Sequence, residues 1–400
     1  MEAAVAQQAV PQAVSQGGRE GRALVAYDLW LIGAALVLLA IGVIMVVSTS
    51  VAIAERRELD ALFYFWRQLI GGGLGITVAI VITRLPLRHL EQMSSVLLFA
   101  GMALAVAVLV PGLGREVNGS MRWIGLGPIT LQASEVAKLA VIIYLAAYLV
   151  RHNQQVRADF IGFIKPIGVL TVIGGLFVIE PDFGAAVVLF ATGLGMLFLG
   201  GVPMLRFIFW GLAALAALAA LSMLAPYRVQ RLMTFMDPWS DPFNSGFQLT
   251  QALIAFGRGE WFGVGLGNSV QKLFYLPEVH TDFVFAVIGE EVGLLGSIGV
   301  IALFMFLVWR IFYLGGVAER ANQLFAAYVT YGIGLLIGIQ AFVNIGVNMG
   351  LLPTKGLPLP FLSYASNNLV VNCAAIGIVL RAGYEARRPA APTTRAGEDA

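Results

Sequence analysis

Charged side chains are scarce in this chain of 400 residues. Asp, Glu, Lys and Arg make up only 12% of the sequence, hydrophobic residues make up 59%, and the mean hydropathy is +0.84. About a quarter of the residues in a soluble globular domain are charged. The composition therefore excludes an ordinary soluble enzyme and indicates an integral membrane protein. The net charge of +2, without a basic patch interleaved with aromatic residues, argues against nucleic-acid binding.

Cysteine and histidine are also rare, which limits redox and metal chemistry. The single cysteine, Cys373, lies in an apolar run, so the chain cannot form an intramolecular disulfide. His89 and His152 are expected on the opposite side of the membrane from His280, which excludes a zinc site built from several histidines. No metal ligand can be assigned. Mg²⁺ or Mn²⁺ remains compatible with the sequence, because substrate phosphates can supply most of the ligands of these ions.

Long apolar runs define the fold class. A membrane-spanning helix needs roughly 20 predominantly apolar residues, and the chain contains about ten such segments. We therefore predict an all-α, polytopic integral membrane protein with about ten transmembrane helices and a long extracytoplasmic loop. The predicted spans are 27–50, 62–83, 93–111, 131–150, 160–180, 183–201, 205–225, 282–310, 322–348 and 362–382.

The remaining segments give the topology and the domain organisation. An even number of spans puts both termini on one side, and the short loops on that side carry an excess of arginine, which predicts cytoplasmic termini. Residues 1–26 are predicted to be a disordered N-terminus, 27–385 the transmembrane domain, and 386–400 a flexible tail. The predicted outer segments are 112–131, the hairpin at 180–183, the large loop 226–281, and 349–361.

The run from Lys272 to Glu291, KLFYLPEVHTDFVFAVIGEE, brings five charged residues and a histidine to the point where a polar loop passes into an apolar helix. Charge at the lip of a membrane is costly and usually functional. Asp282 precedes an apolar helix, where it could simply cap the helix or act as a partly desolvated general base. Glu278 and His280 are expected to shape the entrance to a site. Glu290 and Glu291 are expected to be buried structural charges, deeper along the same helix, paired with Lys138 or an arginine.

Other outer segments carry further candidates for substrate binding. Arg122 could bind phosphate through its guanidinium fork or anchor to headgroups beside Trp123. Glu135 and Lys138 share one helical face and could form an ion pair or line a polar cavity. Asp182 could cap a helix or face an outer cavity. Lys355 lies in a segment where three prolines forbid a regular helix, and it could neutralise a pyrophosphate or extend to the membrane surface.

Several separated motifs, taken in order, resemble the SEDS family (shape, elongation, division and sporulation) of bacterial cell-wall glycosyltransferases. The resemblance covers residues 27–385 and favours the division branch over the elongation branch. One departure occurs after Tyr364, where the family usually continues GGSS and this chain reads ASNN. The motifs are VNGSMRWIGLG followed by ASEVAKL, EPDFG, SGFQLTQALIAFGRGEWFGVGLGNSVQKL, YLPEVHTDFVFAVIGEE and LLPTKGLPLPFLSY.

The resemblance implies an activity, a site and partners. It implies polymerisation of lipid II, the undecaprenyl-pyrophosphate-linked disaccharide pentapeptide, onto a growing glycan strand, with Asp282 as the catalytic base. Arg122, Lys138 and Lys355 are then expected to balance the charge of the leaving pyrophosphate, with or without a divalent cation. The implied partners are the class B penicillin-binding protein FtsI and other division proteins, in the inner membrane at the septum.

Two other functions remain open on the sequence. A transporter that flips lipid II would suit the many spans and the intramembrane Glu290 and Glu291. However, the polar residues crowd the outer face, and no internal repeat is visible. A non-catalytic scaffold for division proteins would leave Asp282 dispensable. The three hypotheses differ in what they require of Asp282.

Overall fold

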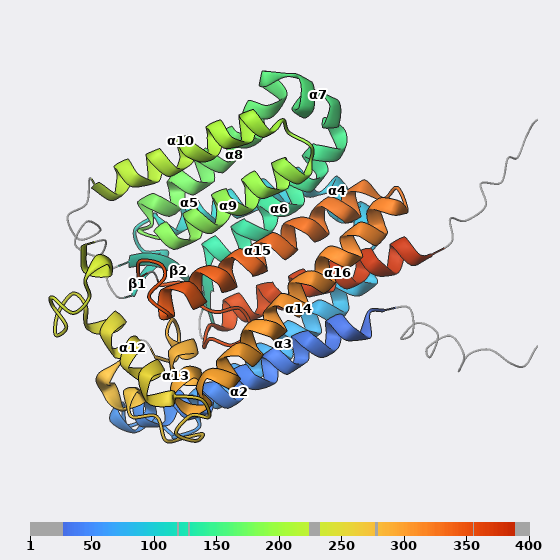
Figure 1. The fold of residues 1–400 in the computed structure, drawn as a ribbon. Helices are drawn as coiled ribbons and strands as arrows, with labels where there is room; N and C mark the ends of the chain where they lie inside the picture. Colours follow the sequence, from blue (N-terminus) through green and yellow to red (C-terminus); the bar gives the residue numbers. More distant parts are fainter. Residues whose placement is uncertain are drawn as a thin grey trace, which may run out of the picture.

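The computed structural model describes residues 27–117, 120–126, 129–223, 233–276, 279–354 and 356–388. Its helices form an elongated bundle (Figure 1). The predicted N-terminal tail 1–26 and residues 389–400 of the predicted tail 386–400 lie outside the described residues, as do the candidate residues Glu278 and Lys355.

The helices confirm the predicted fold class. Seven described helices are long and apolar enough to cross a membrane, and α5, α9 and part of α10 are shorter apolar helices. The helices are α2 (Leu29–Arg56), α3 (Phe63–Arg84), α4 (Leu87–Gln92), α5 (Ser94–Val108), α6 (Ala133–Arg151), α7 (Asn153–Ala158), α8 (Phe160–Ile179), α9 (Phe183–Leu199), α10 (Met204–Met223), α12 (Phe247–Gly259), α13 (Val284–Glu291), α14 (Gly293–Arg320), α15 (Leu324–Asn348) and α16 (Ser366–Arg387). A short π-helical turn, η1, covers Gln271–Tyr275.

Burial separates inner helices from outer ones. Most of α6, α15 and α16 is buried in the protein, 78%, 67% and 67% of their apolar windows. In α2, α3 and α14 the buried share is only 22–33%, because one face of each is left for lipid. The polar groups that need partners inside the protein are therefore expected on the three inner helices.

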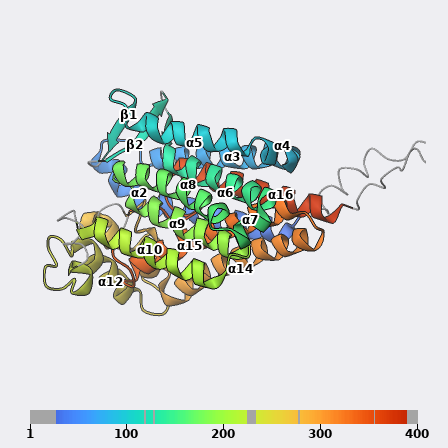
Figure 2. The same cartoon turned by 90° about the horizontal axis from the view of Figure 1, so that it is seen from above.

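The bundle has two distinct ends. The sheet strands, α12 and α13 lie at one end in both views, which we call the site end (Figures 1 and 2). Helix α2 begins and α16 ends at the opposite end, which we call the tail end. The segments predicted to face outward thus gather at the site end, and the described chain starts and finishes at the tail end.

A small antiparallel sheet precedes α6. Its strands are β1 (Gly114–Val117), β2 (Ser120–Leu126) and β3 (Ile129–Gln132), in the order β1-β2-β3. Trp123 pairs with Gln132, the last strand residue, and α6 starts at the next residue. From the sequence, this region was expected to be a loop. Strands as short as β1 and β3, with four residues each, show no clear alternation of apolar and polar residues. The sheet fixes where α6 enters the bundle.

The predicted span 282–310 is not one helix, which corrects the sequence prediction. Helix α13 ends at Glu291, and α14 starts at Gly293, whose φ of +74° is a conformation that favours glycine. The freed carbonyls of Glu290 and Glu291 accept hydrogen bonds from the backbone N–H groups of residues 264 and 265, at 2.9 and 3.0 Å. The loop after α12 thus satisfies the backbone that the break exposes, as an apolar surrounding requires.

An ion-pair cluster joins three helices at the tail end. Asp28 caps α2 by accepting from the Leu31 amide, and its carboxylate also accepts two hydrogen bonds from Arg310 and one from Arg387. Burial acts to raise the pKa of Asp28, but these hydrogen bonds outweigh it, so the pKa lies below its ordinary value of 3.8. Ionised Asp28 therefore stabilises the fold at neutral pH, and this contribution is lost as the pH falls below 3.8.

We predict that Asp28→Asn lowers the free energy of unfolding at neutral pH by roughly 2–3 kcal/mol, because charge-assisted hydrogen bonds to two arginines are lost. Thermal unfolding in detergent micelles would measure the change. The difference from the unsubstituted protein should shrink as the pH falls below 3.8, the ordinary pKa of the carboxyl. Glu55→Gln, at an exposed carboxylate on the same helix, is the control and should change little. An equal loss in both variants would contradict the role of the cluster.

Candidate functional site

Asp282 lies in the turn that leads into α13 and is half-buried. Its backbone carbonyl accepts hydrogen bonds from the side-chain amides of Asn344 and Asn348 on α15, at 2.9 and 3.0 Å. Its carboxylate faces the backbone of Gly356, where a β-carbon would stand 2.9 Å from Oδ2. Asp282 is thus held between the inner helix α15 and the proline-rich segment, and it does not form the first turn of a long helix.

His280 forms one wall beside this turn. Its ring packs against Tyr64 and Tyr364, with centroid distances of 5.5 and 5.6 Å, and the two tyrosine rings lie 5.1 Å apart. The backbone N–H of Tyr364 donates to the His280 carbonyl at 2.8 Å. This aromatic cluster ties α3 and the segment before α16 to the Asp282 turn. The position is consistent with the predicted role of His280 in shaping the entrance.

Lys138 and Glu135 form a buried ion pair on α6. The ammonium group donates to Glu135 at 2.9 Å and to the side-chain oxygen of Gln340 on α15 at 3.1 Å. The other carboxylate oxygen of Glu135 accepts from Asn368 on α16 at 2.9 Å. The pair therefore joins all three inner helices. Lys138 is fully buried, so in this conformation it does not face an open cavity.

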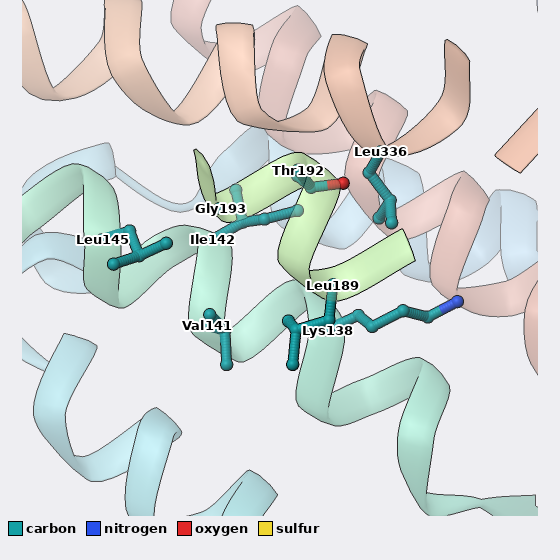
Figure 3. Close-up of a pocket in the computed structure, with 8 residues that line it drawn as sticks. All are labelled: Lys138, Val141, Ile142, Leu145, Leu189, Thr192, Gly193 and Leu336. Atoms are coloured by element: carbon teal, nitrogen blue, oxygen red, sulfur yellow. The ribbon is translucent and has the colours of Figure 1, made fainter. Parts of the chain in front are cut away.

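The hydrocarbon stem of Lys138 borders an apolar crevice between α6, α9 and α15 (Figure 3). The crevice is too narrow to hold a water molecule. In Figure 3 the ammonium nitrogen is turned away from Val141 and Leu145. The crevice is lined by Lys138, Val141, Ile142, Leu145, Leu189, Thr192, Gly193 and Leu336. Because the surroundings are dry, the Lys138 charge depends on its protein partners.

Arg122 and Asp182 meet at the α8–α9 hairpin. The guanidinium lies 3.8 Å from the Asp182 carboxylate and also donates to the Pro181 carbonyl. Asp182 is the predicted cap of α9, accepting from the Ala185 amide at 3.3 Å, and it also accepts from Ser134 at the start of α6 at 2.8 Å. The helix cap considered for Asp182 is therefore present, and its other predicted role, facing an outer cavity, stays a prediction.

Glu180, at the same hairpin, is a buried carboxylate that sequence reasoning did not single out. It is fully buried, and neither carboxylate oxygen has a hydrogen-bond partner among the described residues. Burial, reinforced by the charge of Asp182 and opposed by that of Arg122, raises the pKa of Glu180 to about 8. At neutral pH its carboxyl group therefore carries a proton.

Glu290 and Glu291 are buried charges, as predicted, and the predicted choice of partners, Lys138 or an arginine, is right for Glu290 but not for Glu291. Glu290 pairs with Arg258 on α12 at 2.7 Å and also accepts from Ser269. Glu291 pairs with Lys272 at 3.0 Å and accepts from Ser48 on α2. Lys138 is a partner of neither. The pairs fasten the long loop to α13 and α2, so both glutamates hold the site end together and are not isolated charges deep in a span.

Five of the predicted residues lie along one connected polar structure, which does not include Glu290 or Glu291. Arg122 and Asp182 connect through Ser134 to α6, where the neighbouring residue Glu135 pairs with Lys138. Helix α15 then carries the connection from Lys138 to the Asp282 turn. Glu278 and Lys355 lie outside the described residues, so their proposed roles stay predictions.

Several carboxamide residues in this structure were missed by the sequence reading. Gln340, Asn344 and Asn348 lie four residues apart within the apolar span 322–348, and a polar stripe of this kind is itself a signal of internal pairing. Asn368, in the segment that departs from the usual family pattern, binds Glu135. These side chains carry no charge, and the candidates from the sequence were chosen for charge.

The described residues contain no group of three or more His, Cys, Asp and Glu side chains placed to hold a metal ion. A Mg²⁺ or Mn²⁺ ion next to Asp282 would therefore take most of its ligands from substrate phosphates and water, which is ordinary for Mg²⁺.

Comparisons with known proteins agree on one family. The family model for FtsW, RodA and SpoVE, described as cell cycle proteins, matches residues 29–388. A relative from Nitrosococcus halophilus is 54% identical over 364 residues, covering 90% of this chain and 93% of its own. A relative from Hahella chejuensis is 55% identical over 359 residues, covering 90% of each chain. Both relatives are called probable peptidoglycan glycosyltransferase FtsW.

Solved structures share the fold at lower identity. A chain of a peptidoglycan synthase complex that coordinates polymerization and crosslinking is 29% identical, with a TM-score of 0.74 over 91% of this chain and 99% of that one. The rod shape determining protein RodA of Thermus thermophilus is 27% identical, with a TM-score of 0.67 over 91% and 98% of the two chains. The higher identities to division proteins agree with the branch favoured by the motifs.

We predict that Glu180→Gln changes how stability depends on pH. The raised pKa means that the folded protein disfavours ionised Glu180, so its stability falls as the pH rises from 4.5, the ordinary value, to about 8. The variant lacks this titration. Its unfolding temperature relative to that of the unsubstituted protein should therefore rise between these two pH values, and the difference should stay constant at higher pH. Thermal unfolding at a series of pH values would measure the gain. A pH-independent difference would contradict the assignment.

Proposed function

Since this chain belongs to the FtsW, RodA and SpoVE family of cell cycle proteins, we propose that it is a peptidoglycan glycosyltransferase that polymerises lipid II, with Asp282 as the general base. Full-length relatives of more than 50% identity that carry the glycosyltransferase name support the activity. The observation that supports the role of Asp282 is its place in the fold. Its turn is fixed from behind by α15, and its carboxylate faces the exposed backbone of Gly356 at the site end.

The proposed reaction is a displacement at an anomeric carbon. The Asp282 carboxylate accepts the proton from the 4-hydroxyl of the acceptor sugar of lipid II. The resulting oxygen nucleophile attacks the anomeric carbon at the lipid-linked end of the growing strand. The new glycosidic bond forms as the bond to undecaprenyl pyrophosphate breaks, and the configuration at that carbon inverts. The pyrophosphate leaves with the bonding electron pair, so the charges to be balanced lie on its oxygens.

Of the two predicted cations that the structure describes, Arg122 is more accessible to the pyrophosphate than Lys138. Its side chain is 26% exposed, and its ion pair with Asp182 is long at 3.8 Å, so the guanidinium can also reach a ligand. Lys138 is neutralised by Glu135 in a dry interior. We assign Lys138 to holding α6 against α15, and it reaches a phosphate only if that pair opens. Lys355, next to Gly356 in the chain, stays the third candidate.

The cellular setting is proposed from the family. We place the site end on the outer face of the bacterial inner membrane and the tail end, with both termini, in the cytoplasm, in line with the excess of arginine in the short loops there. A class B penicillin-binding protein, FtsI, is the proposed crosslinking partner at the septum. The solved relative from a synthase complex that couples polymerization to crosslinking supports a partner of this type.

We predict that Asp282→Asn lowers the rate of glycan polymerisation by at least about 100-fold, because the amide cannot accept the proton. Purified full-length protein, mixed with its transpeptidase partner and lipid II, would be assayed by gel separation of the products. Asp237→Asn, at an exposed residue in the long loop, is the control and should retain activity.

Undiminished polymerisation by Asp282→Asn would contradict the proposed base. The same variant separates the alternatives, because a lipid II flippase or a non-catalytic scaffold would not need a proton acceptor at this place. The transporter hypothesis has also lost one of its supports. Glu290 and Glu291, which that hypothesis uses as intramembrane charges, are paired with Arg258 and Lys272 of the long loop.

We predict that Gly356→Ala slows polymerisation by roughly 10- to 100-fold without lowering the unfolding temperature. The added β-carbon would stand 2.9 Å from the Asp282 carboxylate and would displace it, and displacement of a reacting group by about 1 Å costs up to 100-fold in rate. The turnover rate and thermal unfolding would be measured together. Gly73→Ala, where a β-carbon meets open space, is the control. Equal rates in both variants would argue against this placement of the carboxylate.

A further inference from the structure

Three carboxamide side chains follow one face of the inner helix α15. Gln340, Asn344 and Asn348 are spaced by four residues, so they stack with a rise of about 6 Å per step. All three are at most 1% exposed. We call them the carboxamide ladder. Such groups are costly in an apolar interior unless each donor and acceptor is paired, so their hydrogen bonds show what the ladder does.

Asn344 and Asn348 of the carboxamide ladder hold the Asp282 turn. The amide groups of Asn344 and Asn348 both donate to the Asp282 carbonyl. The side-chain oxygen of Asn348 accepts from the backbone N–H of Ala286, in the first turn of α13, at 3.0 Å, and this N–H also donates to the Phe283 carbonyl at 3.1 Å. Asp282 is thus fixed from both sides, at its own carbonyl and at the helix that follows it.

Gln340 and Asn344 hold the proline-rich segment that faces the Asp282 carboxylate. Asn344 also donates to the Leu357 carbonyl at 2.6 Å, and Gln340 donates to the Pro358 carbonyl at 3.0 Å. The side-chain oxygen of Gln340 accepts from Lys138. Asn344 therefore uses its two N–H groups on two separate chain segments, which it joins across the site.

The polarity of these contacts is fully determined. The amide nitrogens donate to backbone carbonyl oxygens and, from Asn348, also to the side-chain oxygen of Asn344 at 3.3 Å. The side-chain oxygens accept only from N–H groups and from the Lys138 ammonium group. A carboxylate at residue 344 would keep the shape of asparagine and place an oxygen against the carbonyls of Asp282 and Leu357. Aspartate substitution therefore tests the donors without changing side-chain volume.

We propose that Asn344 and Asn348 are positioning residues for the glycosyl transfer. They set the distance between the Asp282 carboxylate and the segment 356–358, between which the acceptor hydroxyl must enter. This inference rests on the proposed function and adds two uncharged residues to it. They act through the backbone of Asp282 and do not touch the substrate. Their loss therefore moves the base without removing it.

The test compares steady-state kinetics of Asn344→Asp, Asn348→Asp and Asn344→Leu. Full-length protein in complex with its transpeptidase partner would be assayed over a range of lipid II concentrations and of pH. We expect kcat to fall by about 10- to 100-fold, since a displaced base costs this much, while KM for lipid II changes less than about 3-fold. The pH dependence of kcat should also shift, because the surroundings of the base change.

Two controls separate positioning from folding. Asn153→Asp removes a matched amide hydrogen bond, to the Tyr328 hydroxyl near the tail end, and should retain the kcat of the unsubstituted protein. Thermal unfolding and the binding of lipid II, measured for every variant, identify the folded fraction. If the leucine variant fails to fold, the isosteric aspartate variants carry the test.

The outcomes are distinct. Reduced kcat with intact lipid II binding supports the positioning role. Unchanged kcat and pH profile per folded molecule, with only a lower unfolding temperature, would show a purely structural role and overturn the inference. Asp282→Asn is assayed in parallel. If that variant is fully active, the proposed function itself fails, whereas an inactive Asp282→Asn beside fully active ladder variants rejects the ladder alone.

Discussion

The structure depends on one constraint, which is that polar groups in the apolar interior must find partners within the protein. Around the candidate site those partners come from other helices. Glu135 and Lys138 on α6 are paired with Asn368 on α16 and Gln340 on α15. Because each bond joins two elements, satisfying the polar groups also fixes the helices against one another. The packing of apolar side chains alone would not select this arrangement so sharply, since lipid tails compete for the same surfaces.

The sequence was sufficient for most of the spans and insufficient for contacts made at a distance. Hydropathy located the helices because their length is set by the membrane. It missed the break at Gly293, because apolar residues resume directly after Glu290 and Glu291, and the compensating hydrogen bonds come from the distant loop at residues 264 and 265. Which residues pair with Glu290 could likewise not be predicted from the sequence. Arg258 and Ser269 lie 32 and 21 residues away, on elements whose docking no local pattern reports.

The departure from the usual family pattern after Tyr364 acquires a physical meaning in the fold. Asn367 donates to the Thr130 carbonyl in β3, and Asn368 donates to the Glu135 carboxylate. The start of α16 is therefore attached to the sheet and to the buried ion pair by amide groups. The asparagines at these positions therefore add hydrogen bonds from α16 to β3 and to α6.

The Asp28 cluster also bears on how the chain is assembled in the membrane. Asp28 opens the first described helix, but Arg310 and Arg387 follow it by 282 and 359 residues. Throughout synthesis of the intervening helices this carboxylate has neither arginine available. The first helix can be locked only after α14 has been inserted, and the lock is complete only with the last turn of α16. A chain cut short before that point keeps an uncompensated acidic group at the membrane boundary, so the cluster distinguishes finished molecules from unfinished ones.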